Sequence, residues 1–67
     1  MMQVVINGQH CSLDDGATVE ALIERLACGH RGVAVAVNSE IVPRSAWTVT
    51  RLYADDMVEV LHAVQGG

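Results

Sequence analysis

Residues 1–13 read MMQVVINGQHCSL, and this stretch predicts how the fold begins. Asn7-Gly8 between two extended runs is a strong short-range signal for a β-hairpin with a two-residue turn. The turn fixes the register, because Ile6 then pairs with Gln9 and the other pairs follow outward. One face of the hairpin is expected to carry Met2, Val4, Ile6, Cys11 and Leu13, and the other Gln3, Val5, His10 and Ser12.

A helix is predicted from about residue 18 to about residue 28, directly after the hairpin. Asp14, Asp15 and Gly16 break the strand pattern, and Thr18 suits the N-cap position. Gly29 suits the position just past the helix end. The apolar residues follow the spacing of a single buried stripe, made of Val19, Leu22, Ile23 and Leu26.

Two or three further strands are expected after the helix. Val33–Val37 is a short Val/Ala run that suits a buried central strand. Residues 40–42 suit an edge strand, because Pro43 lacks the N–H needed for a sheet ladder. The last strand is predicted over Met57–Val64, with Val58, Val60 and His62 on one face and Met57, Glu59, Leu61 and Ala63 on the other. Residues 45–53 give no clear pattern beyond a short turn around Trp47, which is expected to pack over the core edge.

The order of these elements predicts an α+β fold in which a four- to five-stranded mixed sheet packs on one helix, at about residues 18–28. This is the β-grasp or ubiquitin-like arrangement, in which the first and last strands are central, parallel neighbours. Residues 1–63 are predicted to form one domain, and residues 64–67 a flexible tail.

Composition argues against several classes of function. Eight acidic residues against four arginines, with no lysine, give a formal charge of −4, which disfavours nucleic acid as a partner. The missing lysine excludes an ordinary phosphate-binding loop and a Schiff base on this chain. Cys11 and Cys28 lie in no pattern of metal ligands, so no metal site is predicted. No apolar run reaches membrane-spanning length, so we expect no membrane association and a cytoplasmic protein.

The sequence ends in Gly66-Gly67, a pair without side chains that could thread a narrow channel in another protein. A frayed or artificial end is the simpler alternative. The domain before the tail decides between these two interpretations.

Over nearly its whole length the chain resembles the sulfur carrier proteins of thiamine biosynthesis, the ThiS family. The resemblance rests on the opening hairpin, Gly16-Ala17-Thr18-Val19, the run VAVNSEIVPR at residues 35–44, Trp47, the acidic turn Asp55-Asp56 and Gly66-Gly67. The middle run is the most specific part, since the glycine pair occurs in ubiquitin-like proteins generally. One departure is the acidic turn, where the family usually has Asp-Gly-Asp.

The resemblance implies a carrier and not an enzyme, with no catalytic residue and no bound cofactor. A partner enzyme would use MgATP to adenylate the carboxylate of Gly67. A sulfur donor such as a cysteine desulfurase would then convert the adenylate to a thiocarboxylate, and thiazole synthase would take up the sulfur. Gly66 and Gln65 would thread into the partner sites.

Leu61 and Ala63, with Met57 and Val5, are predicted to form an apolar patch that docks on these partners. Ordinary half-exposed sheet residues are the alternative for this patch. For the whole chain, the alternatives are the small subunit of molybdopterin synthase, a ubiquitin-like modifier and a plain interaction module. The sequence leaves open which donor supplies the sulfur, whether a covalent link to a partner cysteine forms and whether the chain dimerises.

Overall fold

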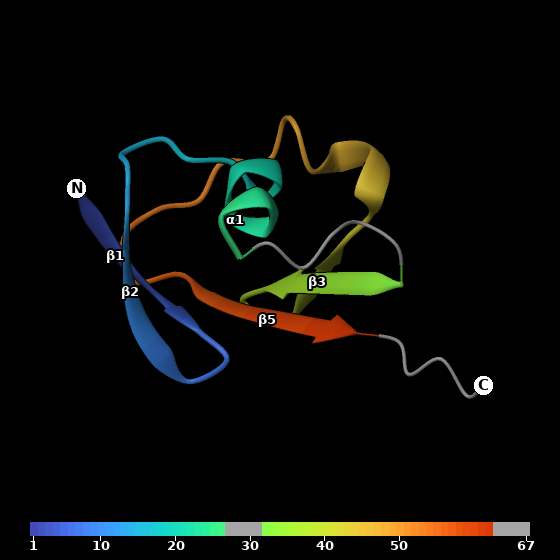
Figure 1. Cartoon of the computed structure of the whole chain (residues 1–67), viewed down its shortest axis with the longest axis horizontal. Helices are drawn as coiled ribbons and strands as arrows, with labels where there is room; N and C mark the ends of the chain where they lie inside the picture. Colours follow the sequence, from blue (N-terminus) through green and yellow to red (C-terminus); the bar gives the residue numbers. More distant parts are fainter. Residues whose placement is uncertain (27–31, 63–67) are drawn as a thin grey trace.

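The computed structural model describes residues 1–26 and 32–62 as a mixed sheet with one α-helix packed across it (Figure 1). The elements in chain order are β1 (Met2–Ile6), β2 (Gln9–Leu13), α1 (Val19–Leu26), β3 (Val33–Val37), β4 (Glu40–Val42), the 3-10 helix η1 (Arg44–Ala46) and β5 (Met57–His62). The five strands lie in the order β2-β1-β5-β3-β4. β1 and β5 run parallel and the other neighbours antiparallel. The predicted β-grasp arrangement, with parallel first and last strands inside the sheet, is confirmed.

The first hairpin has the predicted register, from Ile6 opposite Gln9 to Met2 opposite Leu13. Asn7 and Gly8 have φ values of 50° and 83°, as a type I′ turn requires. These left-handed angles explain the Asn-Gly pair, because glycine and asparagine tolerate them best.

Helix α1 begins where Thr18 caps it, as predicted. The Thr18 hydroxyl accepts a hydrogen bond from the Ala21 N–H at 3.2 Å. The N–H groups of Val19 and Glu20 donate to carbonyls of the segment after η1, at 2.9 and 3.1 Å. The start of the helix is thus bonded to residues about 30 positions later in the chain. The predicted helix end at Cys28 and the stop at Gly29 lie outside the described residues.

The core lies between α1 and the sheet, and Trp47 is part of it. The side chain of Trp47 is 1% exposed, and its indole N–H donates to the carbonyl of Val42 at 3.0 Å. The prediction that Trp47 packs against the core is confirmed, and the indole is enclosed by the core and not only placed over its edge. The core consists of Met2, Val4, Ile6, Leu13, Val19, Leu22, Ile23, Val35, Trp47, Leu52, Val58 and Val60.

β3 is interior in the sheet, as predicted, but it is not buried on both faces. Val35 is buried and Ala34 is exposed. Helix α1 and the segment after β4 lie on the same side of the sheet in Figure 1, which leaves the other face of β3 open. The alternation of valine with alanine reflects this difference, since the larger side chains fill the core side.

The acidic turn before β5 forms without the glycine that the family usually has between its two aspartates. Asp55 itself adopts a left-handed φ of 69°, which aspartate tolerates better than most residues. The carboxylate of Asp56 accepts a hydrogen bond from the Tyr53 N–H at 2.8 Å. β5 follows as predicted up to His62, whereas the end of the predicted strand, the domain boundary at residue 63 and the tail at 64–67 lie outside the described residues.

Candidate docking face

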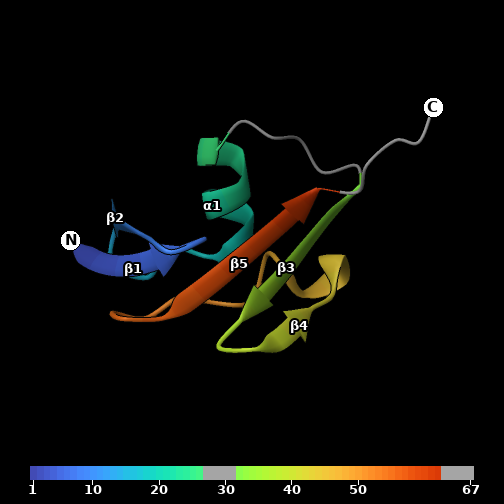
Figure 2. The ribbon, with the colours of Figure 1, turned by 90° about the horizontal axis from the view of Figure 1, so that it is seen from below.

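The sheet has one face that no described element covers, and we call it the open face (Figure 2). The registers of the strands decide which side chains it carries, since directly paired residues point to the same side. Val5 pairs with Met57, Ala36 with both Glu59 and Ile41, and Ala34 with Leu61. The open face therefore carries Gln3, Val5, His10, Ser12, Ala34, Ala36, Ile41, Met57, Glu59 and Leu61.

Three of the four residues predicted for the docking patch lie together on this face. Met57 and Leu61 are 61% and 66% exposed, an unusual state for large apolar side chains on an interior strand. Val5 is half-buried beside Met57. The fourth, Ala63, lies outside the described residues.

The sequence prediction missed Ile41, which extends the apolar surface to the edge strand β4. Its side chain is 78% exposed and lies across Ala36 from Glu59. The Asn38-Ser39 turn contained the signal that identifies it. A two-residue turn at 38–39 pairs Ala36 with Ile41, and so puts Ile41 on the face opposite to that of Val35.

Two shallow hollows flank Glu59 on the open face. One is lined by Val5, Asn7, Gly8, Asn38, Ser39, Met57, Val58 and Glu59. The other is lined by Ala34, Val35, Ala36, Ser39, Ile41, Glu59 and Leu61. Their linings are mostly apolar, so they suit apolar side chains of a docked protein.

Two asparagines hold β5 in place from the neighbouring turns. The Asn7 side chain accepts from the Val60 N–H at 2.9 Å and donates to the Val60 carbonyl at 3.2 Å. It thereby continues the β1–β5 ladder by one step beyond the end of β1. From the other side, Asn38 accepts from the Met57 N–H and donates to the Asp56 carboxylate, both at 3.0 Å. The strand that leads toward the glycine pair is thus fixed near both of its ends.

The remaining predicted site residues, Gly67, Gly66 and Gln65, lie outside the described residues. Among residues 1–26 and 32–62, no group of three or more metal-ligating side chains gathers. His10 and Cys11 are neighbours on β2 and point to opposite faces, so within this strand they do not form a nucleophile with its base. No helix within the described ranges is long and apolar enough to cross a membrane.

Comparisons with known proteins agree with this fold. A crystal structure of the thiamine biosynthesis protein ThiS from Geobacter metallireducens superposes with a TM-score of 0.83 at 29% sequence identity, covering 98% of this chain and 100% of that one. A solution structure of a thiamine biosynthesis protein from the same organism gives a TM-score of 0.80 at 29% identity, covering 98% and 88%. The backbone path is therefore that of the ThiS structures.

Sequence comparison gives the family. The sulfur carrier protein ThiS of Escherichia coli is 33% identical over 66 residues, which cover 98% of this chain and 100% of that protein. The thiazole synthase of Paramagnetospirillum magneticum is 38% identical over 66 residues, but the chain spans only 20% of its length. The ThiS family matches residues 3–67, including the run at 35–44, Trp47 and the final glycine pair. This chain belongs to the ThiS family.

Proposed function

We propose that this chain is the sulfur carrier of thiamine biosynthesis, and that the carboxyl group of Gly67 carries the sulfur. The observation that supports this most is the family match, which extends from the first hairpin through Gly66-Gly67. The 33% identity over the full length of the Escherichia coli sulfur carrier supports the same function.

The proposed chemistry has two steps. A carboxylate resists attack by a nucleophile, because its negative charge and resonance oppose addition. Attack of the Gly67 carboxylate on the α-phosphorus of MgATP in a partner enzyme releases pyrophosphate and leaves an acyl-adenylate. Sulfur from a donor then attacks the acyl carbon and expels AMP; where this sulfur is the outer atom of a donor persulfide, a thiol reductant supplies the two electrons that cleave the S–S bond and leave a thiocarboxylate on Gly67. Gly66 and Gln65 precede this group, and glycine gives the chain the clearance to enter an enclosed site.

The chain's own role in this scheme is binding and not catalysis. The open face, with Val5, Met57 and Leu61 and its extension to Ile41, would dock on each partner while the tail enters the partner's active site. The partner enzyme would bind and consume MgATP, so this chain needs no cofactor of its own. Because activation consumes ATP, we place the carrier in the cytoplasm.

Thiazole synthase is the proposed acceptor of the sulfur. Two proteins with that name, from Paramagnetospirillum magneticum and Magnetococcus marinus, each contain a 66-residue stretch that is 38% or 33% identical to this chain. In both, that stretch makes up 20% of a longer polypeptide. A carrier-like segment and the remainder of a thiazole synthase thus occur in one protein, which supports a physical partnership. A cysteine desulfurase is the proposed class of donor.

Intact-mass spectrometry tests the proposal. The purified chain is incubated with MgATP, its cognate adenylating enzyme and a sulfur donor. We expect a product in which one oxygen is replaced by sulfur, and fragmentation should locate the exchange at Gly67. The chain that lacks Gly67 should stay folded by circular dichroism and gain no sulfur, because the residue lies outside the predicted domain. Thiocarboxylation of the truncated chain at its new end, or no sulfur on the full chain, would contradict the proposal.

A further inference from the structure

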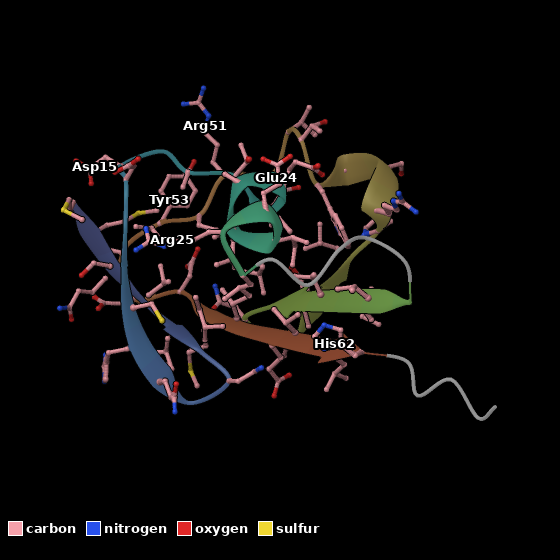
Figure 3. All side chains as sticks on the ribbon, in the orientation of Figure 1. Asp15, Glu24, Arg25, Arg51, Tyr53 and His62 are labelled. Carbon is pink, nitrogen blue, oxygen red and sulfur yellow. The ribbon has the colours of Figure 1, made fainter. Side chains whose placement is uncertain are left out.

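Glu59 is the only charged side chain among the described residues of the open face. It lies on β5, the middle strand of the sheet, between Met57 and Leu61. The three described arginines lie elsewhere. Arg25 and Arg51 are on the helix side of the sheet (Figure 3), and Arg44 begins η1. The carboxylate of Glu59 makes no ion pair or hydrogen bond with another described residue.

The surroundings of Glu59 are apolar along β5 and toward β3, whereas the hollow on its other side is also lined by Asn7, Asn38 and Ser39. Met57 and Leu61 precede and follow it on the same face of β5, and Ala36 and then Ile41 lie across from it. The carboxylate also lies between the two hollows, since Glu59 lines both. A protein that filled both hollows would cover Glu59 and remove it from water.

A carboxylate in that position requires a partner charge. Burying an ionised group without a compensating partner is costly, and charged residues are depleted from the centres of protein interfaces for this reason. No arginine lies on the open face among the described residues, so the compensating cation of this proposal is one that the docked protein supplies. A buried, hydrogen-bonded pair of this kind would also discriminate against partners that lack the basic group.

We infer that Glu59 is a specificity-determining residue of the docking face, and that it pairs with an arginine or lysine of the adenylating enzyme. Apolar side chains of that enzyme flank the basic residue and occupy the two hollows. This inference rests on the proposed function for the identity of the partner. The pair fixes how the carrier is oriented on the enzyme and therefore where its tail enters.

Two substitutions at Glu59 separate this inference from a simple apolar contact. Glu59→Leu removes the charge and adds apolar surface, whereas Glu59→Gln keeps the shape and removes the charge. The affinity of each variant for the purified adenylating enzyme is measured by calorimetry at several salt concentrations. Glu24→Gln is the matched control, because Glu24 is exposed on α1, on the helix side of the sheet (Figure 3).

We expect Glu59→Leu to weaken binding by about thirtyfold or more, since it leaves the partner's cation buried and unpaired. Glu59→Gln should weaken binding by about tenfold and reduce its salt dependence, whereas Glu24→Gln should stay within about twofold of wild type. Binding of Glu59→Leu as tight as wild type, or tighter, would overturn the inference. The proposed function is tested separately in the same preparation, where mass spectrometry shows whether the wild-type chain becomes thiocarboxylated.

Discussion

The two faces of the sheet are formed by the same strands but differ in how exposed their side chains are. On β5, Val58 and Val60 point toward α1 and are 1% and 5% exposed, whereas Met57 before them and Leu61 after them are 61% and 66% exposed. Both faces are rich in apolar side chains, and only one is covered. The covered face holds the domain together, and the open face is the surface that we propose to dock on another protein.

This difference shows how one sheet in a chain of 67 residues can provide both a core and an exposed apolar surface. A small domain has few residues, and alternation along each strand places some side chains in the core and the others on the proposed docking face. Each of the following substitutions tests one side of that division.

The largest effect is expected from a charge placed on the covered face. Val58→Asp should leave the chain largely unfolded, because an unpaired carboxylate at a site 1% exposed costs several kcal/mol, and total stability is only about 5–15 kcal/mol. The neighbouring Met57→Asp should change the free energy of unfolding by less than about 0.5 kcal/mol, because Met57 is exposed. Chemical denaturation followed by circular dichroism measures both. Equal stability of the two variants would refute the assignment of the faces.

An intermediate effect is expected from a charge on the open face. Leu61→Glu should weaken binding to the adenylating enzyme by about tenfold or more, because the introduced carboxylate must be desolvated on docking. Its free energy of unfolding should stay near that of wild type. The readout is the KM for the carrier in the adenylation reaction.

Val49→Glu is the matched control for Leu61→Glu. Val49 is 76% exposed, and it lies next to Thr50, whose carbonyl accepts from the Val19 N–H at the start of α1. The same charge is thus added on the helix side, where we expect the KM to be unchanged. If Leu61→Glu and Val49→Glu raised the KM equally, net charge and not the open face would govern docking.

The smallest effect is expected at the turn between β1 and β2, where the Asn7 side chain bonds to the backbone of Val60. Asn7→Gly keeps the left-handed turn and removes both side-chain bonds to Val60. It should lower the free energy of unfolding by about 1 kcal/mol and speed amide exchange at Val60. Asn38→Gly, which removes the bond to the Met57 N–H, should leave exchange at Val60 unchanged. If the Val60 amide is as protected from exchange in Asn7→Gly as in wild type, the asparagine does not hold β5.

Much of the fold could be predicted from the sequence, because the decisive signals are local. Asn7-Gly8 defines the register of the first hairpin, and alternation along β5 separates Val58 from Met57. Thr18 marks the start of α1, where its hydroxyl accepts from the Ala21 N–H. These features depend on residues within one turn or one strand of each other.

The segment from residue 45 to residue 53 could not be read in this way, because its structure depends on distant contacts. Trp47 and Leu52 are both 1% exposed, and the Leu52 N–H donates to the Ala17 carbonyl at 2.8 Å. No period of two or of 3.6 residues accompanies such packing. Ile41 is a different case, because its place on the open face follows from the local two-residue turn at Asn38-Ser39, which pairs it with Ala36.

Intact-mass analysis of the chain purified from the cells that make it is the most direct test of whether Gly67 carries sulfur. We expect a fraction of molecules in which one oxygen of the Gly67 carboxyl group is replaced by sulfur, and that fraction should disappear when the adenylating enzyme is deleted. A branched conjugate of Gly67 with a lysine of another protein would indicate a modifier instead. That result, or a thiocarboxylate that persists without the adenylating enzyme, would contradict the account.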